Sequence, residues 1–372
     1  MKKYIPLSKP SISNLEREYV SEAIDSGYVS SIGKFINLFE EKFAEYCGTE
    51  YAVATSTGTS AIHLALAAYE IKKGDEIIVP DLTFISTANA VKYTGAEVVI
   101  IDINKDYLCI EPLLIEKALT QNTKAIIAVH LYGHPANMTE IIEIANKQGL
   151  IVIEDAAEAQ GAEVETKKTG SFGDCAAFSF YGNKIMTTGQ GGMLTTNSKE
   201  VFRKAKSLQR YAMNPKKRYW HDEIGYNYQM SNLQAALGLA QLERIDELLE
   251  KKREIFKKYN DNLSDITCLK INYTAEWAVN SYWLICLEIE GYSQEKRDNL
   301  INYLKLKSIE SRPFFYPISD MPIYKNNKVN TPIAHKIYKR GICLPSYFAL
   351  ENSDIDYICD VLRTYIISNP IV

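Results

Sequence analysis

The first half of this 372-residue chain alternates between short apolar runs and amphipathic stretches, and this alternation constrains the fold more than any other feature. Helical stretches are predicted between the strands, at 60–70, 84–93 and 138–148. Runs that are almost continuously apolar indicate strands that helices cover on both faces. The pattern therefore predicts an α/β fold with an open, mostly parallel sheet. The predicted strands are 52–55, 76–80, 97–102, 125–130, 150–155, 174–180 and 191–196.

The pattern of strand and helix signals in the sequence changes near residue 250. Ser231 and Gln234 form a plausible N-terminal capping box, and apolar residues then recur at helical spacing. This pattern predicts one long amphipathic helix that runs into the charged segment 251–258. Shorter strand signals and loops rich in proline follow it. We therefore expect a large domain over residues 1–248 and a smaller α/β domain over residues 249–372.

Charge and cysteine usage exclude several classes of protein. Lys and Arg number 42 against 46 Asp and Glu, a formal net charge of −4, whereas nucleic-acid binders usually carry a basic excess. The seven cysteines form no C-x-x-C pair, so we expect neither a disulfide framework nor a metal site. No signal peptide and no apolar run of about 20 residues is visible. We therefore expect a cytoplasmic protein that binds neither nucleic acid nor membrane.

Three polar features follow predicted strands, at the sheet edge where open α/β sheets bind ligands. Residues 56–60 begin a helix, whose backbone N–H groups and dipole favour a phosphate. Glu154 and Asp155 end another strand, and a carboxylate there can pair with a protonated pyridine nitrogen. Lys184 precedes a Gly-rich turn, where a lowered pKa would let its amine form a Schiff base. Each feature alone also fits a helix cap or a solvated lysine, but together they suggest pyridoxal phosphate.

The segments TSTGTSAIHLAL, PDLTFISTANA, VHLYGHPANM, IEDAAEAQGA, SFYGNK and GQGGM resemble the sugar aminotransferases of the DegT/DnrJ/EryC1/StrS family. The likeness covers nearly the whole chain. It implies the aspartate aminotransferase-like fold (fold type I) of pyridoxal-phosphate enzymes, and a homodimer with active sites shared across the interface. It also implies amino transfer from glutamate to C4 of a nucleotide-linked 4-keto-6-deoxy sugar. Segments such as SRPFFYPISDMPIY favour the branch that uses GDP-4-keto-6-deoxy-mannose and serves O-antigen biosynthesis.

The resemblance also implies roles for individual residues. Lys184 matches the Schiff-base lysine, Asp155 the partner of the pyridinium nitrogen, and Glu158 the residue that reaches the ring hydroxyl. The other cofactor contacts that it implies are Gly58, Thr59 and Ser179 on the phosphate, Phe84 stacked on the ring, and Asn227 donated by the other subunit. A diphosphate requires cations, and the candidates for the sugar-nucleotide side are Arg210, Arg218, Trp220, His221, Arg312 and Tyr316.

Two residues depart from the pattern of that branch. Gln190 stands where Glu is usual in G-E-G-G, and Ser319 stands where His is common. One alternative is therefore an aminotransferase for a UDP- or dTDP-linked 4-keto or 3-keto sugar. Another is a non-catalytic regulatory or binding protein of the same fold. The related dehydratases that make 3-deoxy sugars carry His in place of the lysine, so Lys184 argues against that chemistry.

Overall fold

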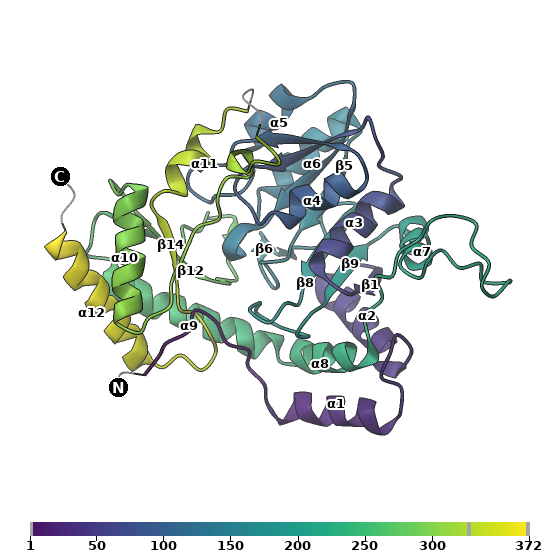
Figure 1. Cartoon of the computed structure of the whole chain (residues 1–372), viewed down its shortest axis with the longest axis horizontal. Helices are drawn as coiled ribbons and strands as arrows, with labels where there is room; N and C mark the ends of the chain where they lie inside the picture. The colour runs from purple at the N-terminus through teal and green to yellow at the C-terminus, as the bar shows by residue number, and fades with distance from the viewer. Residues whose placement is uncertain (1–2, 326–328, 370–372) are drawn as a thin grey trace.

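The computed structural model describes residues 3–325 and 329–369, and its larger body is built on a seven-stranded sheet (Figure 1). Strand pairs that include β9 are antiparallel and the others are parallel, so six strands run one way and β9 the other. The mostly parallel sheet predicted from the sequence is thereby confirmed. In spatial order the strands are β1 (Tyr51–Thr55), β9 (Gly192–Thr196), β8 (Cys175–Ser179), β5 (Ile151–Asp155), β4 (Thr123–Val129), β2 (Glu76–Pro80) and β3 (Glu97–Ile101).

Helices cover both faces of this sheet because successive strand residues point to opposite sides. In β2, Ile77 and Val79 join one core cluster, whereas Ile78 between them joins the other. The first cluster is closed by α3 (Gly58–Ala68), α4 (Ser86–Tyr93) and α7 (Lys199–Leu208). The second is closed by α2 (Lys34–Cys47), α5 (Pro112–Ala118), α6 (Met138–Gln148) and α8 (Asn232–Glu243).

A smaller antiparallel sheet lies in the C-terminal part of the chain. Its strands, in spatial order, are β10 (Leu269–Ile271), β12 (Ile285–Ile289), β14 (Gly341–Leu344) and β13 (Arg312–Pro313). Its core is shared with α9 (Ile245–Leu263), α10 (Gln294–Leu306) and α12 (Asn352–Ser368). Leu248 of α9 packs in the large core and Ile255 in the small one, so the proposed boundary at 248/249 falls inside this helix. Ile5 also packs in this smaller core, although it lies far from the other core residues in the sequence.

The single long helix predicted beyond Ser231 is wrong, because α8 and α9 are separate. The capping box of Ser231 and Gln234 is present at the start of α8. Arg244 leaves the helical conformation, with φ −104° and ψ 7°. Its guanidinium donates to Glu16 of α1 (Asn14–Asp25) over 2.6 Å and to the Ser11 hydroxyl over 3.1 Å. These tertiary contacts override the local helical periodicity.

Short elements complete the two bodies. A three-stranded sheet joins β6 (Glu163–Val164) and β7 (Lys167–Lys168) to β11 (Ala278–Val279). Helix α11 (Pro332–Ile337) packs in the core of the large body through Ala334 and Ile337. Within the described ranges, no helix combines the length and apolar character needed to cross a membrane.

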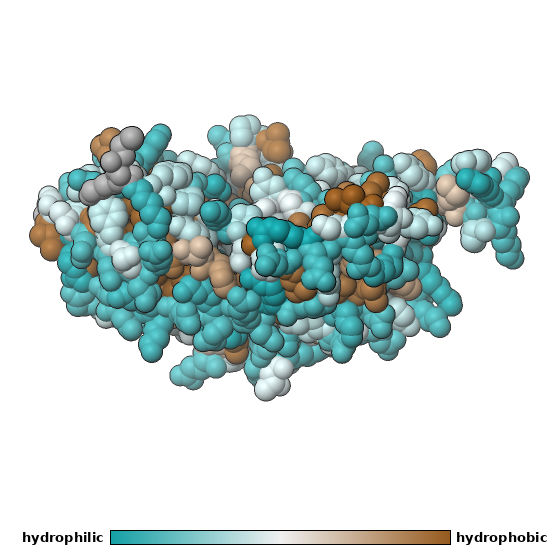
Figure 2. All heavy atoms as spheres, turned by 90° about the horizontal axis from the view of Figure 1, so that it is seen from below, coloured by the Kyte–Doolittle hydropathy of each residue, from teal (hydrophilic) through white to brown (hydrophobic). Residues whose placement is uncertain are grey.

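A loop of residues 209–231 projects from the large body beyond α7 (Figure 1). The face seen in Figure 2 is mostly hydrophilic, but hydrophobic side chains gather on its half nearer to this projection. Apolar side chains that remain exposed after α1 include those of Tyr28, Val29 and Ile32.

Candidate active site

A cavity of about 420 Å³ opens where β5 and β8 end and α3 begins. The carboxyl ends of parallel strands meet at this edge of the sheet, which explains why residues distant in sequence converge here. Segments of the C-terminal body close the other side of the cavity. The residues named from the sequence that line it are Gly58, Thr59, Phe84, Asp155, Glu158, Ser179, Lys184 and Arg312.

Lys184 lies in the segment between β8 and β9 and turns its amine into this cavity. Its Nζ is 3.5 Å from Oε1 of Glu158 and 3.8 Å from the centre of the Trp283 ring. Burial lowers the pKa of Lys184, since desolvation disfavours the ammonium form. Burial also raises the pKa of Glu158 to about 7. Burial therefore brings the pKa values of the amine and of the carboxyl closer together than in water.

Two carboxylates hold fixed places beside the amine. Asp155 ends β5 and accepts hydrogen bonds from the Thr87 hydroxyl at 2.7 Å and the Ala157 N–H at 3.2 Å. Glu158 accepts from the N–H of Tyr132 at 2.9 Å. Burial raises the pKa of Asp155, and a cationic partner beside it would favour the carboxylate form.

Glu154, the neighbour of Asp155, has a structural role instead. Its side chain is fully buried on the other face of β5 and accepts from His130 Nε2 at 2.9 Å. It also accepts from the N–H groups of Gly170, Phe172 and Gly173. The period-2 alternation of the strand separates the two acidic residues, so only Asp155 faces the cavity.

The start of α3 forms the polar end of the cavity. Thr57 caps the helix through its hydroxyl, and Gly58 and Thr59 are its first residues, whose N–H groups have no partner within the helix. A Cβ on Gly58 would lie 2.8 Å from Cβ of Ser179, so only glycine lets α3 approach the end of β8 so closely. The backbone therefore presents free donors and a positive helix end, an arrangement that suits a phosphate.

This set of groups fits pyridoxal 5'-phosphate. Lys184 would provide the amine for the aldehyde, and Asp155 a buried carboxylate for the ring nitrogen. Gly58, Thr59 and Ser179 would provide donors for the phosphate. The buried carboxylate in particular calls for the counter-charge that a protonated pyridine ring would supply.

The remaining predicted residues lie outside the cavity. Tyr316 is exposed and packs against Tyr338, with ring centres 5.5 Å apart. The others are exposed residues of the projecting loop: Arg210, Arg218, Trp220, His221 and Asn227. Within the described part of this single chain, the loop does not reach the cavity.

The two departures from the family pattern differ in their positions. Gln190 lines the cavity, so its side chain can affect substrate choice. Ser319 is buried elsewhere, where its N–H and hydroxyl donate to Asp81 at 2.8 and 2.7 Å. Ser319 therefore fastens the C-terminal segment to the end of β2.

Sequence reasoning missed three residues that act on the site: Thr87, Tyr132 and Trp283. Thr87 lies in a predicted helix close to the matched Phe84, so its position in the motif was a usable signal. Trp283 lies 99 residues beyond Lys184, at the edge of the smaller body, and no local pattern connects the two.

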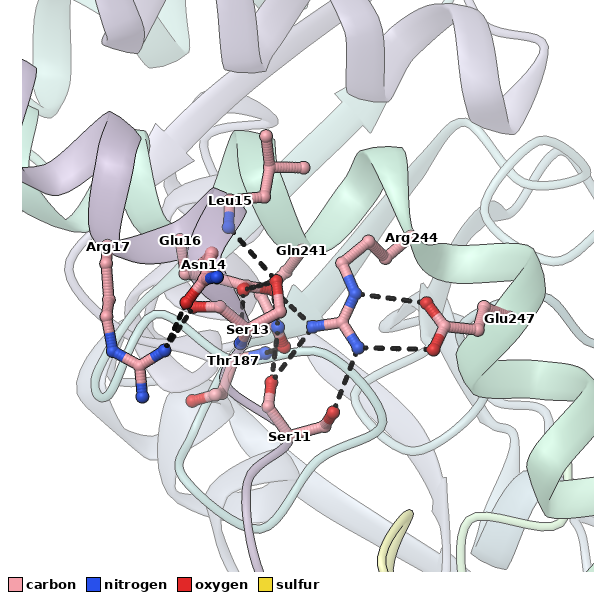
Figure 3. Close-up of polar contacts among 10 residues, drawn as sticks. All are labelled: Ser11, Ser13, Asn14, Leu15, Glu16, Arg17, Thr187, Gln241, Arg244 and Glu247. Atoms are coloured by element: carbon pink, nitrogen blue, oxygen red, sulfur yellow. Dashed lines mark hydrogen bonds and ion pairs between the residues drawn. The ribbon is translucent and has the colours of Figure 1, made fainter.

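A polar cluster supports the segment that follows Lys184 (Figure 3). Gln241 of α8 accepts from the N–H of Thr187 at 3.1 Å and donates to Oε1 of Glu16 at 2.6 Å. Glu16 also accepts from Arg244 at 2.6 Å. The cluster thereby fastens α1, the α8–α9 junction and the lysine segment to one another.

Comparison with known proteins shows which family the chain matches. Residues 10–363 match the model of the DegT/DnrJ/EryC1/StrS aminotransferase family. GDP-perosamine synthase of Escherichia coli O157:H7 is 44% identical over 98% of this chain and 99% of its own length. The protein of the same name from Caulobacter vibrioides is 42% identical over 96% of this chain and 97% of its own.

Solved structures of aminotransferases are also similar to this chain. A putative sugar aminotransferase from Streptococcus pneumoniae in its PLP form superposes with a TM-score of 0.93 at 26% identity, over 98% of this chain and 99% of that one. PseC of Helicobacter pylori, an aminotransferase of pseudoaminic acid biosynthesis, gives 0.93 at 26% identity over 98% and 100%. The chain is thus an aminotransferase whose cofactor is pyridoxal phosphate, which its buried amine and carboxylates fit. It belongs to the DegT/DnrJ/EryC1/StrS aminotransferase family.

Proposed function

We propose that this enzyme transfers the amino group of glutamate to C4 of GDP-4-keto-6-deoxy-mannose, giving GDP-perosamine and 2-oxoglutarate. The observation that carries the chemistry is the buried amine of Lys184 beside Glu158, with Asp155 in the same cavity. The choice of sugar rests on relatives named GDP-perosamine synthase, at 39–44% identity over nearly the whole chain.

The residues of the cavity would have different roles in this reaction. When bound, pyridoxal phosphate supplies an aldehyde that carries the amino group from one substrate to the other. Lys184 Nζ removes the proton from the α-carbon of glutamate and later delivers a proton at C4 of the sugar. Glu158 holds the amine in place, and Asp155 keeps a counter-charge beside the ring nitrogen. Arg312 at the cavity wall is a cation for an anionic group of the substrates.

The proposal extends to assembly and location. A homodimer would let a partner subunit bring Asn227 of the projecting loop to the cavity, and the exposed Tyr28, Val29 and Ile32 support a contact between chains. All seven cysteines are free thiols, which fits the reducing cytoplasm. Supply of an amino sugar for O-antigen is the biosynthetic role that we infer from the proposed product.

A panel of nucleotide-linked keto sugars tests the substrate. The purified enzyme receives glutamate and either GDP-4-keto-6-deoxy-mannose or UDP- and dTDP-linked 4-keto or 3-keto sugars, and the products are weighed by mass spectrometry. We expect efficient amination of the GDP sugar alone, and none with Lys184→Ala. Preference for a UDP or dTDP sugar would contradict the proposed substrate, and absence of amination with every sugar would leave a non-catalytic role.

A further inference from the structure

Trp283 makes two contacts with the segment that carries the reactive amine. The face of its ring lies 3.8 Å from Nζ of Lys184, measured to the ring centre. Its indole N–H donates to the carbonyl of Asn183 at 2.7 Å, one residue before the lysine. One side chain therefore holds both the backbone next to Lys184 and the far end of its side chain.

Trp283 is itself held rigidly. Its side chain is nearly inaccessible, and its carbonyl accepts from the buried Nζ of Lys252 of α9 at 2.9 Å. The backbone of Gly133 packs so closely that a Cβ there would lie 2.7 Å from the N atom of Trp283. The ring of Tyr132 lies nearly parallel to the indole, at 20° and 6.3 Å. The indole therefore has little freedom to leave the amine.

Both partners of the Lys184 amine depend on the same turn at residues 131–133. The N–H of Tyr132 fixes Glu158, while Tyr132 and Gly133 pack against Trp283. Tyr132 adopts a left-handed conformation with φ 55°, which is uncommon for a residue with a side chain. This turn sets the carboxylate and the indole at fixed places around one nitrogen atom.

We propose that Trp283 is a positioning residue of the amination reaction, which keeps the ε-amine of Lys184 beside Glu158 whenever that amine is not bonded to the cofactor. This inference rests on the proposed function. The ring face attracts the protonated amine through its quadrupole, an effect that strengthens where water is excluded. The hydrogen bond from the indole N–H to the carbonyl of Asn183 restricts the movement of the backbone next to Lys184. Together they return the amine to the position from which it moves protons.

The first test measures the amine without the cofactor. Trace labelling of the apo-enzyme with an acylating reagent, followed by mass spectrometry across a range of pH, gives the protonation curve of Lys184. We expect the half-labelling pH to fall by about 1 in Trp283→Leu, because the protonated form loses the ring face. Trp283→Phe keeps a ring face and should stay near the wild type. Lys147, an exposed lysine of α6, serves as the reference in each sample.

The second test follows a single turnover with glutamate through the visible absorbance of the loaded enzyme. We expect Trp283→Leu to slow this step about tenfold at an unchanged half-saturating glutamate concentration, and Trp283→Phe to recover most of the rate. Thermal unfolding of both variants shows whether they are folded; if the leucine variant is not, Trp283→Met, which also has no ring face, replaces it in both tests.

Either of two results would overturn the role of Trp283. One is a Lys184 half-labelling pH in Trp283→Leu equal to or above that of the wild type. The other is a glutamate step that is as slow in Trp283→Phe as in Trp283→Leu, which would show that the ring face does not position the amine. Neither measurement uses the sugar, so failure of the proposed substrate leaves both tests intact.

Discussion

Lys184 is the residue on which the chemistry depends, and its replacement gives the most direct prediction. Lys184→Ala should lower turnover by more than about 10³-fold, because the amine both bonds the cofactor and moves protons. It should also abolish the visible absorbance that borohydride removes from the loaded wild type. Peptide mapping of the reduced wild-type enzyme should place the cofactor on Lys184. A label on Lys252, a second buried lysine whose pKa burial lowers to about 7, would contradict the assignment.

The phosphate end of the cavity gives a second prediction at the residue scale. Gly58→Ala should weaken cofactor binding about tenfold, because overpacking of this kind costs about 1–3 kcal/mol and the new Cβ would press on Ser179. The matched control is Gly182→Ala, where a Cβ meets nothing within 4 Å. Absorbance titration of the two apo-enzymes with pyridoxal phosphate measures the difference. Equal affinities would show that the close approach of α3 to β8 is not required.

Local motifs allowed part of the site to be predicted from single residues. Asp155, Ser179 and Gly58 end strands or begin a helix, and topology alone brings such positions to one edge of the sheet. Trp283 was beyond prediction, because its contact with Lys184 depends on how the two bodies pack. The strand-end pattern left Glu154 and Asp155 open and the family resemblance selected Asp155; strand alternation gives the physical reason, since only Asp155 faces the cavity.

At the scale of elements, the polar cluster of Figure 3 gives a prediction about pH. Burial would raise the pKa of Glu16, but hydrogen bonds from Ser13, Arg244 and Gln241 lower it to about 2. A carboxylate with a depressed pKa stabilises the fold above its unfolded pKa of about 4.5, and this contribution is lost as the pH falls toward 2. Glu16→Gln should therefore reduce the free energy of unfolding at pH 7 by about 2 kcal/mol, allowing for solvent screening.

Urea unfolding across a pH series measures this contribution. The gap between the wild type and Glu16→Gln should narrow as the pH falls from about 4.5 toward 2, because Glu16 of the unfolded chain takes up a proton in this range while the folded carboxylate stays charged. The control is Glu18→Gln on the exposed face of the same helix. A gap that stays constant with pH would show that Glu16 acts through shape or hydrogen bonding and not through its charge.

The same cluster explains why the elements were only partly predictable. Helices α1, α2, α5 and α7 of the large body were not predicted. The strands of its large sheet and the helices α3, α4 and α6 followed from apolar periodicity, because each is buried by its immediate neighbours. The α8–α9 junction did not, since Arg244 interrupts the helix to reach Glu16, 228 residues earlier in the chain. The antiparallel direction of β9 was not predicted either, because the apolar pattern of a fully buried strand is the same in both directions.

At the scale of the whole molecule, several predicted substrate-binding residues lie outside the cavity of the single chain. Arg210 and Asn227 pair at the base of the projecting loop, next to Tyr228, whose carbonyl accepts from the N–H of Ser56. Arg218 and His221 lie farther along this loop, and neither they nor Arg210 and Asn227 line the cavity of their own chain. In a two-fold dimer the same loop of each subunit can serve the other, so the loops would be exchanged in equivalent fashion. In the proposed dimer, the projecting loop would form part of the partner's active site.

Mixing two inactive variants tests this exchange. Lys184→Ala removes the amine, and Asn227→Ala removes the residue that the partner would contribute, so each homodimer should be impaired. If sites are shared, a mixed dimer has one site with both changes and one site with neither. Random mixing should then restore activity to about a quarter of the wild-type value, because half of the dimers are mixed and each has one intact site. If Asn227 instead served the site of its own chain, each site of a mixed dimer would carry one change, and activity after mixing would stay at the level of the separate variants.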